Sequence, residues 1–215
     1  MAVPAAILAS CLPAVAGPSS ASDILALGEH LVQSYAAWAA PIAGPLPAPP
    51  IKPRLLRPSR KRDRDPPWPT LTDSQQAFLF SLAASAEETE LLFGELFHWF
   101  LPAHEMTHWL QRALGLGGDF YTRERMANEC AVAFFMESEA EEERLVALYQ
   151  LLAYALNRLA DPVPPGVDPV AYFNLHYYDL AQDPAAYGHF QFRFITDAIA
   201  RRRSLRLEDL LFGQG

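Results

Sequence analysis

Two histidines four residues apart, with a glutamate directly after the first, form the pattern His104-Glu105-x-x-His108. On an α-helix, residues four apart lie on the same face, so both imidazoles can bind one metal ion. Glu105 is then placed to accept a proton from water that the ion activates, which is the chemistry of hydrolysis. We expect zinc, and a catalytic zinc site needs one further protein ligand.

Two acidic residues further along the chain compete for the role of third ligand. Glu124 shares a helix face with Asn128 and two alanines, and these small side chains would let the histidine helix approach closely. Asn128 could also orient a carboxylate. Glu129 lies among apolar residues, where a charge without a metal or another partner would be costly. Glu124 is therefore favoured, with Glu129 as the alternative.

The two motifs together resemble the zincin metallopeptidases of the ImmA/IrrE type, in which HExxH is followed by a Glu four residues before an Asn. Here that pair is Glu124 and Asn128, and the resemblance spans residues 104–136. It implies that His104, His108 and Glu124 bind the metal, that Glu105 is catalytic, and that the substrate is a peptide or protein. Asn128-Glu129 is also similar to the thermolysin-like gluzincin pattern, which would make Glu129 the ligand.

Peptide hydrolysis also needs a donor for the negative charge that develops on the carbonyl oxygen. The C-terminal region holds several polar aromatic residues that could serve as oxyanion or substrate contacts: Tyr178, Tyr187 and His189, and more widely His176 and Tyr177. Each of these is more commonly a core or loop residue, so they stay candidates.

Helices are the elements expected to position these residues. Pro102 suits the first turn of the histidine helix, and the glycines from 115 to 118 should end it. Before it, Thr72 or Asp73 should cap a helix to Ala84. Ser85 with Glu88 predicts a capping box for a helix to about residue 100.

A long helix is expected to start at Thr122, to be buried from Ala127 to Met136, and to continue through a solvated acidic stretch to Leu159. A last helix is expected from about Phe192 to Arg203. No convincing strand alternation appears, so the fold class is mainly α: a zincin-like helical domain with at most a small β element, preceded by a Pro-rich arm.

The first third of the chain divides by composition. Residues 1–22 predict either a tail without fixed structure or an export signal, because Ala14-Val15-Ala16 suits signal peptidase and Leu8 to Cys11 is similar to a lipobox. Export, lipid anchoring and a cytoplasmic location all stay open. A helix is expected over 23–40, a Pro-rich basic linker over 41–66, and the zincin-like domain over 67–215.

Net charge limits the partners of this 215-residue chain, which is 51% hydrophobic. The formal charge is -8, which argues against a general nucleic-acid binder. The segment 52–64 is nevertheless strongly basic, so an acidic partner for it is possible, although a solvated linker is the commoner meaning. No uninterrupted apolar run is long enough for a transmembrane helix.

These observations favour a zinc-dependent peptidase with Glu105 as general base. The alternative is a non-catalytic, all-helical interaction or regulatory module that retains a metal or uses the histidines structurally. In a third arrangement, the basic arm binds an acidic partner on which the peptidase site acts.

Overall fold

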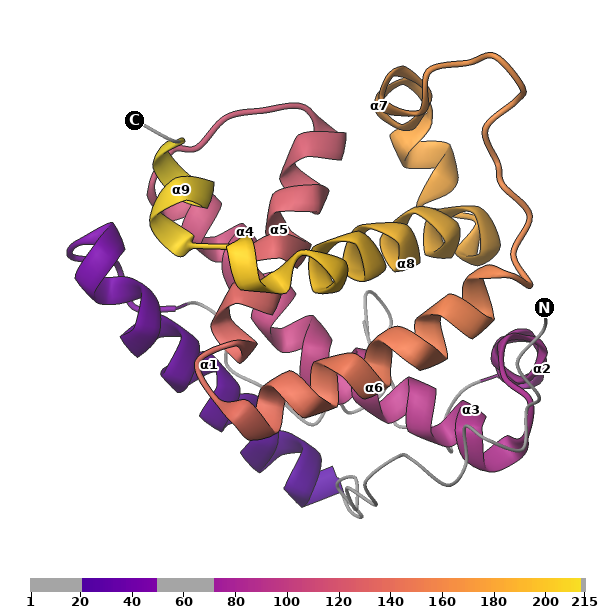
Figure 1. Cartoon of the computed structure of the whole chain (residues 1–215), viewed down its shortest axis with the longest axis horizontal. Coiled ribbons are helices and arrows are strands. Elements are labelled where there is room, and N and C mark those ends of the chain that lie inside the picture. The colour runs from indigo at the N-terminus through magenta and orange to yellow at the C-terminus, as the bar shows by residue number, and fades with distance from the viewer. Residues whose placement is uncertain (1–20, 50–71, 214–215) are drawn as a thin grey trace.

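A computed structural model of the chain describes residues 21–49 and 72–213 (Figure 1). These residues form helices and connecting turns and contain no strand, so the mainly α fold class is confirmed and the allowed β element is absent from this part of the chain. Residues 1–20 of the signal-like segment and the whole basic segment 52–64 lie outside the described residues. None of the described helices is long and apolar enough to cross a membrane.

The first helix, α1 (Ala21–Ala43), is longer than the predicted 23–40 and packs against the helix that carries the HExxH motif. Tyr35 anchors it there, because this fully buried ring places its hydroxyl 2.8 Å from the hydroxyl of Thr107. Figure 1 shows α1 as an indigo diagonal along one edge of the molecule. The helix is thus part of the domain core rather than an isolated arm.

Capping residues set the starts of the next two helices, as predicted. Thr72 and Gln75 form a complete capping box for α2 (Asp73–Leu82). Ser85 accepts a hydrogen bond from the Glu88 amide at the start of α3 (Ala86–Phe93). The Glu88 carboxylate accepts from the amide of Ala84, one residue further back than a capping box requires.

The chain does not break between α3 and the HExxH helix. A π-helix, η3 (Gly94–Phe100), connects them directly, and α4 (Leu101–Ala113) follows with Pro102 in its first turn. Pro102 removes one backbone donor, and it stands where the wider π turns give way to α-helical turns. The two helices that the sequence predicted separately are therefore one continuous helical segment from Ala86 to Ala113.

The predicted single helix from Thr122 to Leu159 is wrong. The structure has two helices, α5 (Phe120–Phe135), capped by Asp119, and α6 (Glu139–Leu156). The turn between them lets α6 fold back and contact α3 and α8. A straight continuation would have carried the buried leucines of α6 away from the core, and their burial favours the turn.

The C-terminal prediction is corrected as well. Two helices, α7 (Pro169–Leu180) and α8 (Pro184–Ala200), each begin with an Asp cap followed by Pro in the first turn. A 3₁₀ turn and α9 (Leu207–Phe212) close the described chain. The predicted last helix therefore starts earlier than Phe192 and ends before Arg203.

Packing places α5 at the centre, against α4 on one side and α8 on another. In Figure 1, α8 crosses the middle of the molecule, and α7 stands at the end far from α1. A separate aromatic cluster, centred on Phe173, Phe190 and Phe194, joins α7 to α8 and to the first turn of α5. This cluster holds α7 beside the start of α5, where Glu124 lies.

Candidate metal centre

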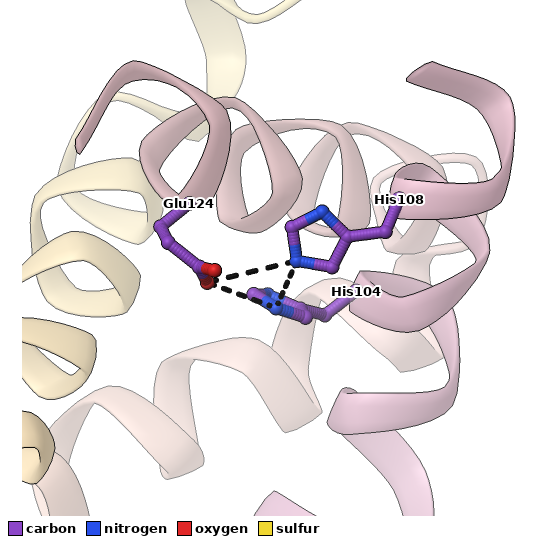
Figure 2. A group of neighbouring side chains, drawn as sticks. All are labelled: His104, His108 and Glu124. Atoms are coloured by element: carbon purple, nitrogen blue, oxygen red, sulfur yellow. Dashed lines mark hydrogen bonds and ion pairs between the residues drawn. The ribbon is translucent and has the colours of Figure 1, made fainter. Parts of the chain in front are cut away.

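Three potential ligands converge between α4 and α5 (Figure 2). His104 and His108 lie one turn apart on α4, and their Nε2 atoms are 3.1 Å apart. The Oε2 atom of Glu124, on α5, lies 3.4 Å from Nε2 of His104 and 3.6 Å from Nε2 of His108. The predicted histidine pair and the favoured third residue are therefore brought together.

The spacing of these three atoms fits a single ion. With bonds of about 2.0–2.1 Å and tetrahedral angles, the ligand atoms of a zinc site lie roughly 3.3 Å from one another. The observed separations of 3.1, 3.4 and 3.6 Å lie around that value. The two His nitrogens and one carboxylate oxygen are also a donor set that zinc accepts.

Hydrogen bonds fix which nitrogen of His104 is free. Its Nδ1 lies 3.0 Å from Oδ1 of Asn128. The amide nitrogen of Asn128 donates to the carbonyl of Glu124 and to Oε1 of Gln191, so its oxygen faces the histidine. Because an amide oxygen only accepts, Nδ1 of His104 carries the proton and Nε2 presents a lone pair. Asn128 thus orients the imidazole rather than directly orienting the carboxylate.

His108 is fixed in the same way from its own helix. Its Nδ1 lies 2.9 Å from Oε1 of Gln111, and the Gln111 amide nitrogen donates to the carbonyl of Arg123. Nδ1 of His108 is therefore the donor, and its Nε2 also presents a lone pair. Two lone pairs facing each other repel unless a proton or a metal ion lies between them. The hydrogen bonds thus organise the pair for a cation.

The charge of Glu124 complements the two imidazoles. Burial alone would raise the pKa of Glu124, but hydrogen bonds and charges from His104 and His108 outweigh burial and hold it well below its usual range. Burial alone would lower the pKa of His108, but the hydrogen bond and charge of Glu124 outweigh burial and raise it. In the metal-free protein, a proton on His108 is therefore stabilised where an ion would bind.

Two further helices hold the carboxylate of Glu124. The Tyr177 hydroxyl, on α7, donates to Oε1 at 3.0 Å, and the Gln191 amide, on α8, donates to Oε2 at 2.9 Å. Burial, and then the charge of Glu124, raise the pKa of Tyr177 to about 12, so the phenol keeps its proton and stays a donor.

Glu105 is not one of the converging ligands, as its place next to His104 predicts. It is half-buried on α4, and its charge contributes to the raised pKa of His108. The carboxylate of Glu105 therefore lies near the two histidines but is not one of the three converging groups.

The alternative ligand, Glu129, lies apart from the three. It is 3% exposed, and its Oε1 accepts hydrogen bonds from Arg125, at 2.9 Å, and from Arg201. The expectation that this buried charge needs a partner holds, and two arginines supply it.

Of the C-terminal candidates, Tyr187 lies near enough to the site that burial, and then the charge of Glu124, raise the pKa of its phenol, whereas the others are dispersed. Tyr178 is 73% exposed on α7, and His189 is buried with its Nε2 3.7 Å from a carboxylate oxygen of Asp161. Tyr187 is close to Tyr177, with ring centroids 6.3 Å apart. His176 has its Nδ1 4.0 Å from a carboxylate oxygen of Asp179. Of the C-terminal aromatic residues, Tyr177 is the one that bonds a ligand.

Sequence reasoning missed both glutamines. Gln111 was detectable in principle, because it lies three residues after His108 and therefore on the same helix face. Gln191 lies 63 residues beyond Asn128 in the sequence, and no spacing rule connects them.

Comparisons with protein-family models, with curated proteins and with solved structures gave no match. The interpretation of this site therefore depends on its geometry and on the motifs themselves.

Proposed function

We propose that this chain is a zinc-dependent peptidase of the HExxH type. The observation that carries the proposal is the convergence of two imidazole lone pairs and one carboxylate oxygen, with Glu105 next to the first histidine. Bound zinc would supply a Lewis acid that activates water and polarises a peptide carbonyl.

The protein's side chains would then hold the ion, orient its ligands and transfer a proton. His104, His108 and Glu124 hold the ion, and Asn128 and Gln111 keep both imidazoles in the ligating tautomer. Glu105 accepts the proton of the attacking water and passes it to the leaving amine.

A second candidate is a helical interaction module that holds a metal without turnover. Two observations favour it. His104 and Glu124 are only 4% and 6% exposed. Zincin substrates commonly add as a strand to a sheet edge, and residues 21–49 and 72–213 offer no strand.

Replacing Glu105 by glutamine separates the two candidates. Gln keeps the size and hydrogen bonding of the side chain but cannot accept a proton, so zinc content should persist while hydrolysis falls at least roughly a hundredfold. Glu143→Gln, on the exposed side of α6, is the matched control. His104→Ala should lose the zinc.

The assay incubates proteome-derived peptides with each zinc-loaded protein and identifies new termini by mass spectrometry. A peptidase gives termini with the wild type and the control that are absent with Glu105→Gln. Equal fragment patterns for all three proteins, with equal zinc content, would refute the peptidase and favour the module.

A further inference from the structure

The two oxygens of Glu124 are held by different helices. Oε2 faces both histidines and accepts a hydrogen bond from Gln191 on α8 at 2.9 Å. Oε1 accepts one from the Tyr177 hydroxyl on α7 at 3.0 Å. These two hydrogen bonds restrict rotation of the carboxylate group, so that a single oxygen is directed at the site where the ion would bind.

Gln191 closes a ring of hydrogen bonds around that site. Its amide oxygen accepts from Asn128 at 3.0 Å, and Asn128 in turn accepts from Nδ1 of His104. One side chain thereby binds the carboxylate of Glu124 directly with its amide nitrogen and acts on the imidazole of His104 through Asn128 with its amide oxygen. To bond both Glu124 and Asn128, the side chain needs a donor and an acceptor at a fixed separation, and a primary amide provides both.

Tyr177 is equally constrained. Its ring stacks face to face on Phe120, with centroids 4.1 Å apart and planes 4° apart. Phe120 is the first residue of α5, one turn before Glu124. The phenol that occupies Oε1 is therefore fixed to the same helix as the carboxylate that it binds.

We propose that Gln191 and Tyr177 are positioning residues that hold Glu124 as a one-oxygen ligand. Three protein atoms then bind the ion, and a coordination position stays open for water or substrate, as catalytic zinc sites require. This inference rests on the metal site proposed above and adds to it the device that keeps the site open.

The test uses Co²⁺ as a spectroscopic probe in the full-length protein. Tyr177→Phe deletes one oxygen atom and releases Oε1 of Glu124. Co²⁺ should still bind, but the second carboxylate oxygen can now join it, and the visible absorption should weaken as the coordination number rises. Tyr178→Phe makes the same change at the neighbouring, 73% exposed tyrosine and should leave the spectrum unchanged.

Gln191→Met keeps the length of the side chain and removes both hydrogen bonds. The dissociation constant for Co²⁺ should rise about 10–100-fold, the usual effect of losing a residue that orients metal ligands. Gln150→Met, at an exposed position on α6, is the control for the substitution itself. If Gln191→Met does not fold, as judged by circular dichroism, Tyr177→Phe decides the question.

The outcomes are distinct for the two proposals. Wild type that binds neither Co²⁺ nor Zn²⁺ overturns the metal site and this inference together. Wild type that binds Co²⁺, with a spectrum and affinity that Tyr177→Phe and Gln191→Met both leave unchanged, overturns the inference alone.

Discussion

Alanine at Glu124 and alanine at Glu129 should both lower stability, but only the first should also remove the response to zinc. Glu124 contributes one of the three converging ligand atoms, so Glu124→Ala should remove most of the stabilisation that zinc provides. Glu129 is paired with two arginines, so Glu129→Ala should lower the intrinsic stability and leave the zinc response intact.

The size of each effect follows from the contacts. Zinc at about 1,000 times its dissociation constant stabilises the folded state by about 4.1 kcal/mol, which for a chain of this length raises Tm by roughly 8–16 °C. Loss of the third ligand should weaken binding at least roughly 100-fold, and the gain then falls to about 1.4 kcal/mol.

Glu129→Ala loses hydrogen bonds between charged groups, worth about 1.5–3 kcal/mol in total. The cost stays in that range because the side chains of Arg125 and Arg201 are 43% and 46% exposed, so water solvates them after the loss. Tm should fall by about 3–12 °C at any zinc concentration.

Thermal unfolding followed by circular dichroism, with excess zinc and with a chelator, measures both effects. The difference between the two melting temperatures should be small for Glu124→Ala and equal to that of the wild type for Glu129→Ala. A normal zinc response in Glu124→Ala together with a lost response in Glu129→Ala would refute the assignment of the third ligand.

Two other predictions concern pH and a buried ion pair. Zinc binds neutral imidazoles, so a proton on His108 competes with the ion. Burial lowers the pKa of His108, but the hydrogen bond and charge of Glu124 raise it by more. Zinc affinity should therefore be full at alkaline pH and fall as the pH drops through that raised pKa, beginning above the usual histidine range. Competition titrations at several pH values check this, and an affinity that declines only below the usual histidine pKa would contradict it. Glu95→Ala leaves the side chain of Arg144, which is only 14% exposed, without the buried carboxylate that it binds through both Nε and Nη2, so the free energy of unfolding should fall by about 3–5 kcal/mol. Urea titration of the metal-free protein measures this loss. A change under about 1 kcal/mol, which is the contribution of a solvent-exposed ion pair, would show that Arg144 reaches water in the variant.

Local patterns in the sequence were sufficient to predict the shared helix face of the two histidines and most of the helix starts. The i, i+4 spacing of His104 and His108 fixes their common face in any helix, and caps such as Thr72 and Ser85 act within four residues. Glu124 could be preferred over Glu129 because small residues on its face permit close helix packing. Each of these inferences needs only one helix or two neighbouring ones.

The parts that could not be predicted depend on distant packing. Tyr177 and Gln191 reach Glu124 from α7 and α8, which are 53 and 67 residues away along the chain. The turn after Phe135 depends on the contacts that α6 makes with α3 and α8. The partners of Glu129 also come partly from afar, since Arg201 lies 72 residues away. Hydrophobic periodicity in the sequence does not predict contacts between residues so far apart along the chain.

The burial of Tyr35 under the HExxH helix bears on where this chain can be shortened. The described part of the domain is assembled from two stretches of sequence on either side of the Pro-rich segment, and α1 covers the back of α4. A fragment that begins at Asp73 would expose the hydroxyl of Thr107 and the apolar surface around it, directly behind the histidines. The smallest unit able to present this site therefore includes α1, even though the three potential ligands lie between residues 104 and 124.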